Sequence, residues 1–138
     1  MEVTVAVLAD AANIAKGEKL NILGTFDRIA VPAFPWTHPF MVLALAFRLT
    51  YEDARATHEL AVTIKDEDGH DVAKASTTAK IGDLPAGEFA TVNQILAFAA
   101  VGFTKPGRLL FDVTWDRVLK ASVPLVVTKA GGAGERGR

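Results

Sequence analysis

The chain has 138 residues and no cysteine, and 15 Lys and Arg residues nearly balance 16 Asp and Glu residues, which leaves a net charge of −1. This length fits one domain, and the hydrophobic fraction of 50% excludes disorder caused by low hydrophobicity. The charge balance gives no attraction to nucleic acid or to an anionic membrane, and the lack of cysteine excludes disulfides, thiolate metal sites and cysteine nucleophiles.

The start of the chain and its apolar runs predict a cytoplasmic protein. Glu2 stands where a signal peptide needs positive charge. The longest apolar runs, 41–47 and 95–103, are shorter than the roughly 18–20 residues that span a bilayer. The absence of cysteine agrees with a reducing compartment, and abundant Ala with a Gly-Arg ending indicates a high-GC bacterial source.

The first part of the chain predicts three strands and a proline-rich connection. Apolar and polar residues alternate over 3–7 and again over 20–29, which is typical of half-buried strands. Three prolines within 31–39 exclude a helix and a central strand, so we expect an extended crossover between sheets there. The nearly continuous apolar run 41–51 predicts a strand that is covered on both faces.

A hairpin over 60–78 is the clearest local prediction. Apolar residues alternate over 60–64, and 71–78 returns as the partner strand. Asp68 and Gly69 supply the positive-φ positions that a tight hairpin turn needs.

Three further strands are expected in the rest of the chain. Four apolar residues of 89–103 fit a helical stripe, but apolar residues on both faces and the lack of helix caps favour a strand. After a Pro-Gly turn, alternation predicts strands over 108–115 and 118–127. Pro124 predicts that the last strand is an edge at least locally, because proline cannot donate to a neighbour. The expected buried row of that strand is Leu119, Ala121, Val123, Leu125 and Val127.

Together these segments predict an all-β fold: one domain over 1–129, followed by a flexible Gly-rich tail over 130–138. Sequential hairpins and one crossover favour an antiparallel Greek-key, immunoglobulin-like β-sandwich of about seven to nine strands. The Pro-Gly turn and alternating strand of 103–113 resemble the penultimate strand of many immunoglobulin-like modules.

A second resemblance covers about the first thirty residues. The segments 8–12 and 17–29 resemble the opening of a family of small bacterial β-sandwich proteins of unknown function. In that family an acidic residue ends the first strand and a Gly-Lys-Leu, Gly-x-Phe/Trp-Asp hairpin follows. Here Glu18 is inserted between the Gly and the Lys. The resemblance implies the fold and carries no activity with it.

The residues of this chain match known metal-binding and nucleophile motifs only weakly. Asp66, Asp68 and Asp71 surround a glycine as in a calcium loop, but the EF-hand spacing and the bidentate Glu are missing, so we expect a solvated hairpin turn. None of the histidines, His38, His58 and His70, has a His or acidic partner at a metal-ligand spacing. The only serines, Ser76 and Ser122, lie outside any nucleophile elbow, and the glycines of 131–134 lack the strand and helix of a phosphate loop. We expect no metal and no cofactor.

Two carboxylates and three aromatic residues each allow two interpretations. Asp10 and Asp27 offer paired carboxylates for acid–base chemistry, but we favour Asp10 closing the first strand and Asp27 pairing with Arg28 or a backbone amide. Phe34 and Trp36, together with Phe40, would anchor a partner if exposed. If buried they plug an open end of the sandwich, which we favour.

Three functions remain open. The first is a non-enzymatic protein-interaction or structural module that self-associates as a homo-oligomer or binds another protein. Its expected interface consists of Ile95, Leu96, Phe98, Val101, Phe103, Phe34 and Trp36. The second is a sandwich that binds a small apolar ligand or lipid, which a pocket of about 300 Å³ or more would favour. The third is an enzyme with a site assembled from Asp10, Asp27, Arg28, His38 and Arg48. Nucleic acid and membranes are not expected partners.

Overall fold

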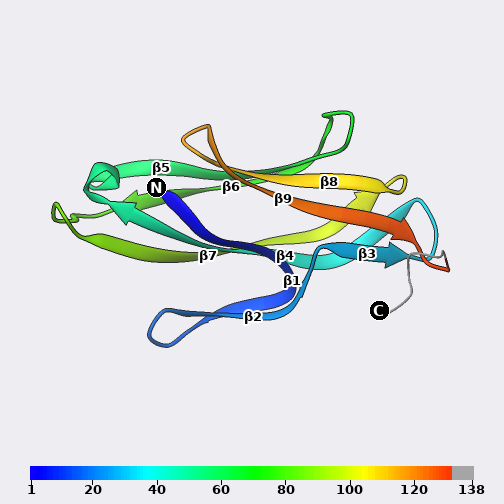
Figure 1. Cartoon of the computed structure of the whole chain (residues 1–138), viewed down its shortest axis with the longest axis horizontal. Helices are drawn as coiled ribbons and strands as arrows, with labels where there is room; N and C mark the ends of the chain where they lie inside the picture. The colour runs from blue at the N-terminus through cyan, green and yellow to red at the C-terminus, as the bar shows by residue number, and fades with distance from the viewer. Residues whose placement is uncertain (132–138) are drawn as a thin grey trace.

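The computed structural model describes residues 1–131 and is built of β-strands apart from one short 3-10 helix (Figure 1). The strands are β1 (Glu2–Ala15), β2 (Lys19–Phe26), β3 (Arg28–Val31), β4 (Trp36–Thr50), β5 (Ala56–Lys65), β6 (Asp71–Ile81), β7 (Phe89–Phe103), β8 (Gly107–Trp115) and β9 (Val118–Lys129). The helix η1 spans Tyr51–Asp53. The predicted all-β fold is confirmed, and 89–103 is a strand. The predicted tail lies outside the described residues from position 132 onward.

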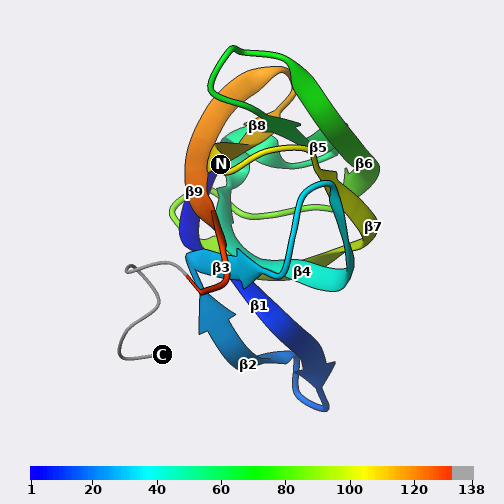
Figure 2. The ribbon, with the colours of Figure 1, turned by 90° about the vertical axis from the view of Figure 1, so that its right-hand side faces the viewer.

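Two sheets form the two layers of the molecule. One has the order β2-β1-β4-β7 and the other has the order β3-β9-β8-β5-β6. Figure 2 shows both sheets curving around one interior. Neighbouring strands pair antiparallel except β3 and β9, which run parallel. The prediction of a purely antiparallel sandwich is wrong at this pair, because β3 is too short and too close to the crossover for alternation to reveal its direction. No helix within residues 1–131 has the length and apolar character that a membrane crossing requires.

The core lies between the two sheets. Phe47 on β4 and Phe111 on β8 are almost completely buried there. On β4 the outward residues Val42 and Ala44 are buried as well, with exposed fractions of 2% and 0%. This confirms that the apolar run of β4 is covered on both faces. Apolar side chains that leave water in this way supply the main driving force for folding.

The β1–β2 hairpin departs from the plane of its sheet. β1 pairs with β4 only as far as Ala9 and then continues to Ala15 with β2 alone. In Figure 1 the hairpin turns back toward the end of the molecule where the N-terminus lies. The backbone oxygen of Glu18 at its tip accepts a hydrogen bond of 2.7 Å from Asn93 Nδ2 on β7. Asp10 therefore lies at the bend of a long strand, and the prediction that it closes the first strand is wrong.

The predicted crossover is shorter in the structure. β4 begins at Trp36, so Pro39 lies inside a strand that is central further along. The proline is tolerated because β1 pairs with β4 only from Val42 onward, which leaves β7 as the sole neighbour at position 39. The same reasoning holds at Pro124 on β9, because β3 pairs only with 126–129. The predicted local edge at Pro124 is confirmed.

The predicted β5–β6 hairpin is confirmed, with Leu60 opposite Thr77. One expected core residue is misplaced on β9: Leu119 is 58% exposed. Val113 faces Ala121 whereas the next residue, Thr114, faces Leu119, so Lys120 is an extra residue in the ladder. This β-bulge shifts the alternation by one position and turns Leu119 toward solvent.

Candidate functional site

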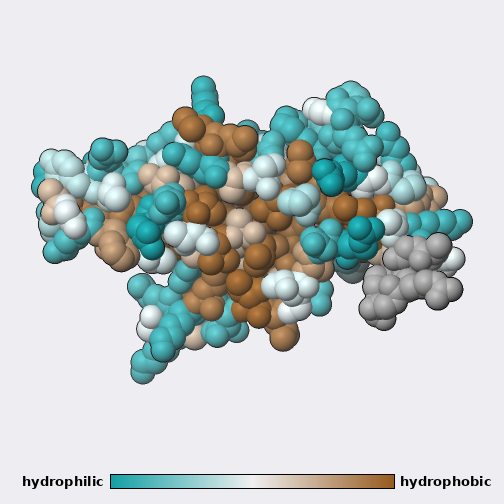
Figure 3. Space-filling model, viewed as in Figure 1, coloured by the Kyte–Doolittle hydropathy of each residue, from teal (hydrophilic) through white to brown (hydrophobic). Residues whose placement is uncertain are grey.

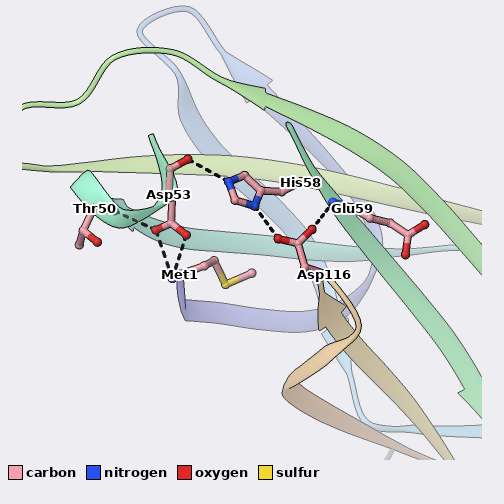
Figure 4. A network of polar contacts seen from close by, with 6 residues as sticks. All are labelled: Met1, Thr50, Asp53, His58, Glu59 and Asp116. Atoms are coloured by element: carbon pink, nitrogen blue, oxygen red, sulfur yellow. Dashed lines mark hydrogen bonds and ion pairs between the residues drawn. The ribbon is translucent and has the colours of Figure 1, made fainter. Parts of the chain in front are cut away.

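A histidine and two aspartates form a polar network at one end of the sandwich (Figure 4). His58 stands at the start of β5. Its Nδ1 lies 2.6 Å from Oδ2 of Asp116 in the β8–β9 turn, and its Nε2 lies 2.9 Å from the backbone oxygen of Asp53. The imidazole stacks on Trp115 with ring centroids 4.6 Å apart. His58 therefore joins three segments and covers an edge of the core.

The partners of His58 favour its protonated form. Both ring nitrogens face oxygen acceptors, and only an imidazolium donates from both nitrogens. Burial lowers the pKa of His58, but the hydrogen bonds to Asp116 and to the Asp53 carbonyl outweigh it, so the pKa lies above its usual value. The hydrogen bond from His58 contributes most to lowering the pKa of Asp116, and the hydrogen bond from the Glu59 amide contributes next. Each partner thus favours the charged form of the other.

Asp53 is the buried charged residue of the described chain, with an exposed fraction of 6%. Its Oδ2 accepts a hydrogen bond of 3.1 Å from the Thr50 amide and lies 3.2 Å from the terminal amino group of Met1. Burial raises the pKa of Asp53, but these contacts together lower it by more than burial raises it. The pKa of Asp53 therefore lies below its usual value. A buried charge needs such partners. The contacts link the beginning of β1 to η1.

This network is arranged for structure rather than for proton transfer. A general base needs one nitrogen directed at a substrate proton. Both nitrogens of His58 are taken by Asp116 and Asp53, and the side chain is 11% exposed. The sequence could not reveal this network, because Asp116 lies 58 positions from His58 and the two meet only through the pairing of β5 with β8.

The acidic turn between β5 and β6 holds itself together. Oδ1 of Asp66 accepts hydrogen bonds of 2.9 Å from the amides of Asp68 and His70, which is the usual stabilisation of an Asx-type turn. Lys105 lies 3.3 Å from Asp68. Asp71 instead pairs with a lysine of β5. The predicted hairpin turn is confirmed. Ligand atoms of Asp66, Asp68 and His70 lie within 4.8 Å of one another, but exposed acidic groups take this arrangement commonly without an ion.

Three of the five residues proposed for an enzyme site meet in one hollow. Asp10, Arg28 and His38 line a hollow of about 300 Å³ beside the bend of β1. Arg48 lies elsewhere, 3.3 Å from Glu2. Asp27 lines a different hollow, and within residues 1–131 its side chain has neither of the partners expected for it.

The predicted interface side chains lie mainly inside the molecule. Leu96, Phe98, Val101 and Phe103 on β7 have exposed fractions of 3% to 7%, and they belong to the core. Ile95 is half-buried. Phe34 and Trp36 are also half-buried and pack against the core, so neither is a fully exposed anchor. Phe40 is 46% exposed. The interface expected from these side chains is therefore not a free surface.

What β7 presents to solvent is its backbone edge. β7 is the last strand of its sheet and pairs with β4 along its whole length, from Phe89 opposite Thr50 to Phe103 opposite Trp36. Its 15 residues include neither a charged residue nor a proline. Its outer positions carry small exposed residues such as Ala97 and Ala99. The N–H and C=O groups directed away from β4 have no strand partner among the described residues.

An apolar hollow lies between β1 and β9. It measures about 390 Å³, and its apolar lining consists of Ala6, Val7, Leu8, Phe26, Val123 and Pro124. Figure 3 shows hydrophobic side chains gathered over the middle of this face.

Comparison with known proteins places the chain in a family. None of the curated proteins searched matches it. The model of a family described as a family of unknown function, DUF6941, matches residues 4–128, from β1 almost to the end of β9. The chain therefore belongs to DUF6941.

Proposed function

We propose that this protein is a non-enzymatic interaction module that self-associates through the free edge of β7. The observation that carries the proposal is the composition of that edge: 15 residues long, without charge and without proline. An exposed strand edge offers unpaired N–H and C=O groups to any other strand. Monomeric proteins protect such edges with charges, prolines, bulges or short strands.

Both outer strands of the second sheet carry that protection. β6, the edge of the second sheet, has Lys74 and Lys80 on exposed positions. β3, at the opposite edge, is only four residues long and begins with Arg28. β7 has one protective feature, Ala100, whose φ of 59° interrupts regular extended backbone. The 11 residues from Phe89 to Ala99 precede that interruption. β2, the other edge of the first sheet, is eight residues long and begins with Lys19. β7 is therefore the longest edge strand of the described chain and carries no charged residue.

The strand order gives a second reason. We propose that the sandwich has the Greek-key, immunoglobulin-like topology, because β1-β4-β7 opposite β9-β8-β5-β6 corresponds to A-B-E opposite G-F-C-C′. In the constant-type fold a further strand, D, pairs with E. Here residues 82–88 connect β6 directly to β7 and supply no such strand. The position of strand D is open beside β7.

A second copy of the chain is the occupant that this edge fits. Two copies of β7 related by a two-fold axis run antiparallel and present the same surface to each other, as a two-fold interface requires. The strand has no charge to repel its own copy. The small side chains of Ala97 and Ala99 allow close approach. The result would be one continuous sheet across two subunits.

Light scattering of the purified chain over a range of concentrations tests this proposal. We expect a dimer or larger species that dissociates in a variant with Ala97→Lys and Ala99→Lys, because facing lysines repel across a paired edge. Ser76→Lys on the exposed side of β6 is the matched control and should keep the mass of the parent protein. A parent chain that stays monomeric, or a double variant with unchanged mass, would contradict the proposal.

The apolar hollow between β1 and β9 supports a second candidate function, the binding of a small apolar ligand. Its volume of about 390 Å³ lies in the range of ligand sites, and the hollow is lined by Val7, Phe26 and Val123. Saturable binding of a fatty acid that Val123→Asp abolishes would support this function. Binding that is unaffected by Val123→Asp would exclude this hollow as the site.

A cytoplasmic location and a bacterial source remain part of the proposal. The location rests on the cysteine-free composition, and the source rests on the abundance of Ala together with the Gly-Arg ending of the chain.

A further inference from the structure

A polar hollow opens where the β1–β2 hairpin leaves its sheet. Its volume is about 300 Å³, at the lower end of small-molecule sites. Four strands contribute to its lining: Asp10 comes from β1, 24–26 from β2, 28–30 from β3 and His38 from β4. The bend of β1 brings these strand ends together. The hollow is separate from the edge of β7 and from the His58 network.

Gly24 sets the position of the Asp10 carboxylate. A Cβ at position 24 would lie 2.5 Å from Oδ2 of Asp10, so the carboxylate occupies space that every other residue type would fill. Gly24 also has a φ of +72°, which side chains disfavour. The carboxylate therefore rests against β2 at the wall of the hollow. This placement depends on one glycine directly opposite one aspartate.

The hollow is lined by an acidic and a basic side chain that do not pair with each other. Asp10 and Arg28 both line it, yet neither takes part in an ion pair within residues 1–131. The ring nitrogens of His38 and the hydroxyl of Thr25 make no hydrogen bond to another described residue. A carboxylate, a guanidinium, an imidazole and a hydroxyl thus remain available to a ligand. Only water or a ligand can satisfy them there.

We propose that this hollow binds a small zwitterion of the α-amino acid class with an apolar side chain. The guanidinium fork of Arg28 matches a carboxylate in a bidentate geometry. The carboxylate of Asp10 accepts hydrogen bonds from an ammonium group. Phe26 and Ile29, which are half-buried and pack against the core, supply an apolar wall for the side chain. A ligand with both charges on one carbon bridges groups that do not reach each other.

Three related probes test which groups the hollow recognises. L-Leucine has both charges, L-leucinamide lacks the carboxylate and 4-methylpentanoate lacks the ammonium group. In nuclear magnetic resonance titrations of the full chain, leucine should shift the backbone amides of Gly24, Thr25 and Ala30. Each of the other two probes should bind at least about tenfold more weakly, because it loses one charge-assisted hydrogen bond.

Charge-neutralising variants assign the binding to the two residues. Arg28→Gln and Asp10→Asn should each weaken leucine binding at least about tenfold. Both side chains are exposed, so the fold should persist. Arg117→Gln in the β8–β9 turn and Asp27→Asn beside the hollow are the matched controls and should bind as the parent does. The proposal is overturned if leucine shifts no amide up to about 10 mM, if the three probes bind equally, or if the variants bind as tightly as the controls.

Discussion

The imidazole of His58 and the carboxylate of Asp116 approach to 2.6 Å across 58 positions of sequence. The contact joins the first residues of β5 to the turn after β8, which are neighbouring strands of one sheet. The second nitrogen of His58 meets the carbonyl of Asp53, whose buried carboxylate contacts the amino group of Met1. One histidine thereby connects the charged end of the sandwich to the aromatic core at Trp115.

Replacement of His58 should destabilise the fold. His58→Ala removes the stacking on Trp115 and the hydrogen bonds to Asp116 and to the Asp53 carbonyl, which should lower the free energy of unfolding by about 2–4 kcal/mol. Urea unfolding monitored by tryptophan fluorescence measures the loss. His70→Ala is the control: its side chain is 78% exposed in the β5–β6 turn, and we expect a change within about 0.5 kcal/mol. Equal stabilities of the two variants would disprove the structural role of His58.

The contribution of His58 should depend on pH with a defined sign. Its pKa is raised above its usual value of 6.5, so the folded state binds its proton more tightly than the unfolded state does. The added stability is fully present below about pH 6.5 and is lost as the pH rises through the folded-state pKa. The difference in unfolding free energy between the parent and His58→Phe, measured from pH 5 to pH 9, should therefore decrease at high pH. A difference that is constant or grows with pH would contradict the charged pair.

Asp53 and Asp116 should act in the opposite direction. Their pKa values are lowered from 3.8, so they stabilise the fold above that pH and lose the effect as the pH falls through their folded-state pKa values. Acid titration followed by near-ultraviolet circular dichroism should show that Asp116→Asn reduces this acid dependence. An unaltered acid transition in the variant would show that Asp116 carries no linked proton.

Gly24 should be intolerant of a side chain. Gly24→Ala forces a close contact with Asp10 at a position of positive φ. We expect it to lower the free energy of unfolding by about 2–3 kcal/mol. Gly17 also has a positive φ, but no atom lies within 4 Å of its ideal Cβ. Gly17→Ala should therefore lower the free energy of unfolding only by the cost of the positive φ, about 1 kcal/mol. Thermal unfolding of both variants gives the comparison. If Asp10→Ala fails to recover part of the stability of Gly24→Ala, the close contact is not the cause.

The bulge in β9 predicts different costs for two leucines. Leu125 is fully buried, and Leu125→Ala should cost about 2–5 kcal/mol. Leu119 is 58% exposed, and Leu119→Ala should cost less than about 0.5 kcal/mol. Denaturant unfolding of each variant tests the register. A large loss of stability in Leu119→Ala would contradict the bulge and support the uninterrupted alternation that the sequence predicts.

Local patterns in the sequence predict most of the strands. Alternation and turn residues suffice for β5, β6 and β8, and the doubly apolar run of β4 reflects real burial on both faces. The bulge beside Leu119 escapes such patterns because one inserted residue leaves the composition of the strand unchanged. The length of β1 escapes them as well, since the strand continues past Asp10 by pairing with β2 alone.

The candidate sites depend on long-range contacts and were harder to predict. An apolar strand such as β7 does not reveal from its sequence which face meets the core, so the sequence predicts an interface at Leu96 and Phe98 whereas both side chains lie inside. The hollow that joins Asp10, Arg28 and His38 requires the bend of β1. The chemistry of these three residues groups them in the sequence, whereas no pattern in the sequence points to the partner of His58.

Amide hydrogen exchange along β7, measured at low and high protein concentration, tests the proposed self-association most directly. In a single chain the amides of β7 that point away from β4 have no strand partner, so they should exchange fast at low concentration. We predict that exchange of 89–99 slows at high concentration, while that of the edge strand β6 does not change. Slower exchange elsewhere with β7 unchanged, or exchange independent of concentration throughout, would contradict pairing through this edge.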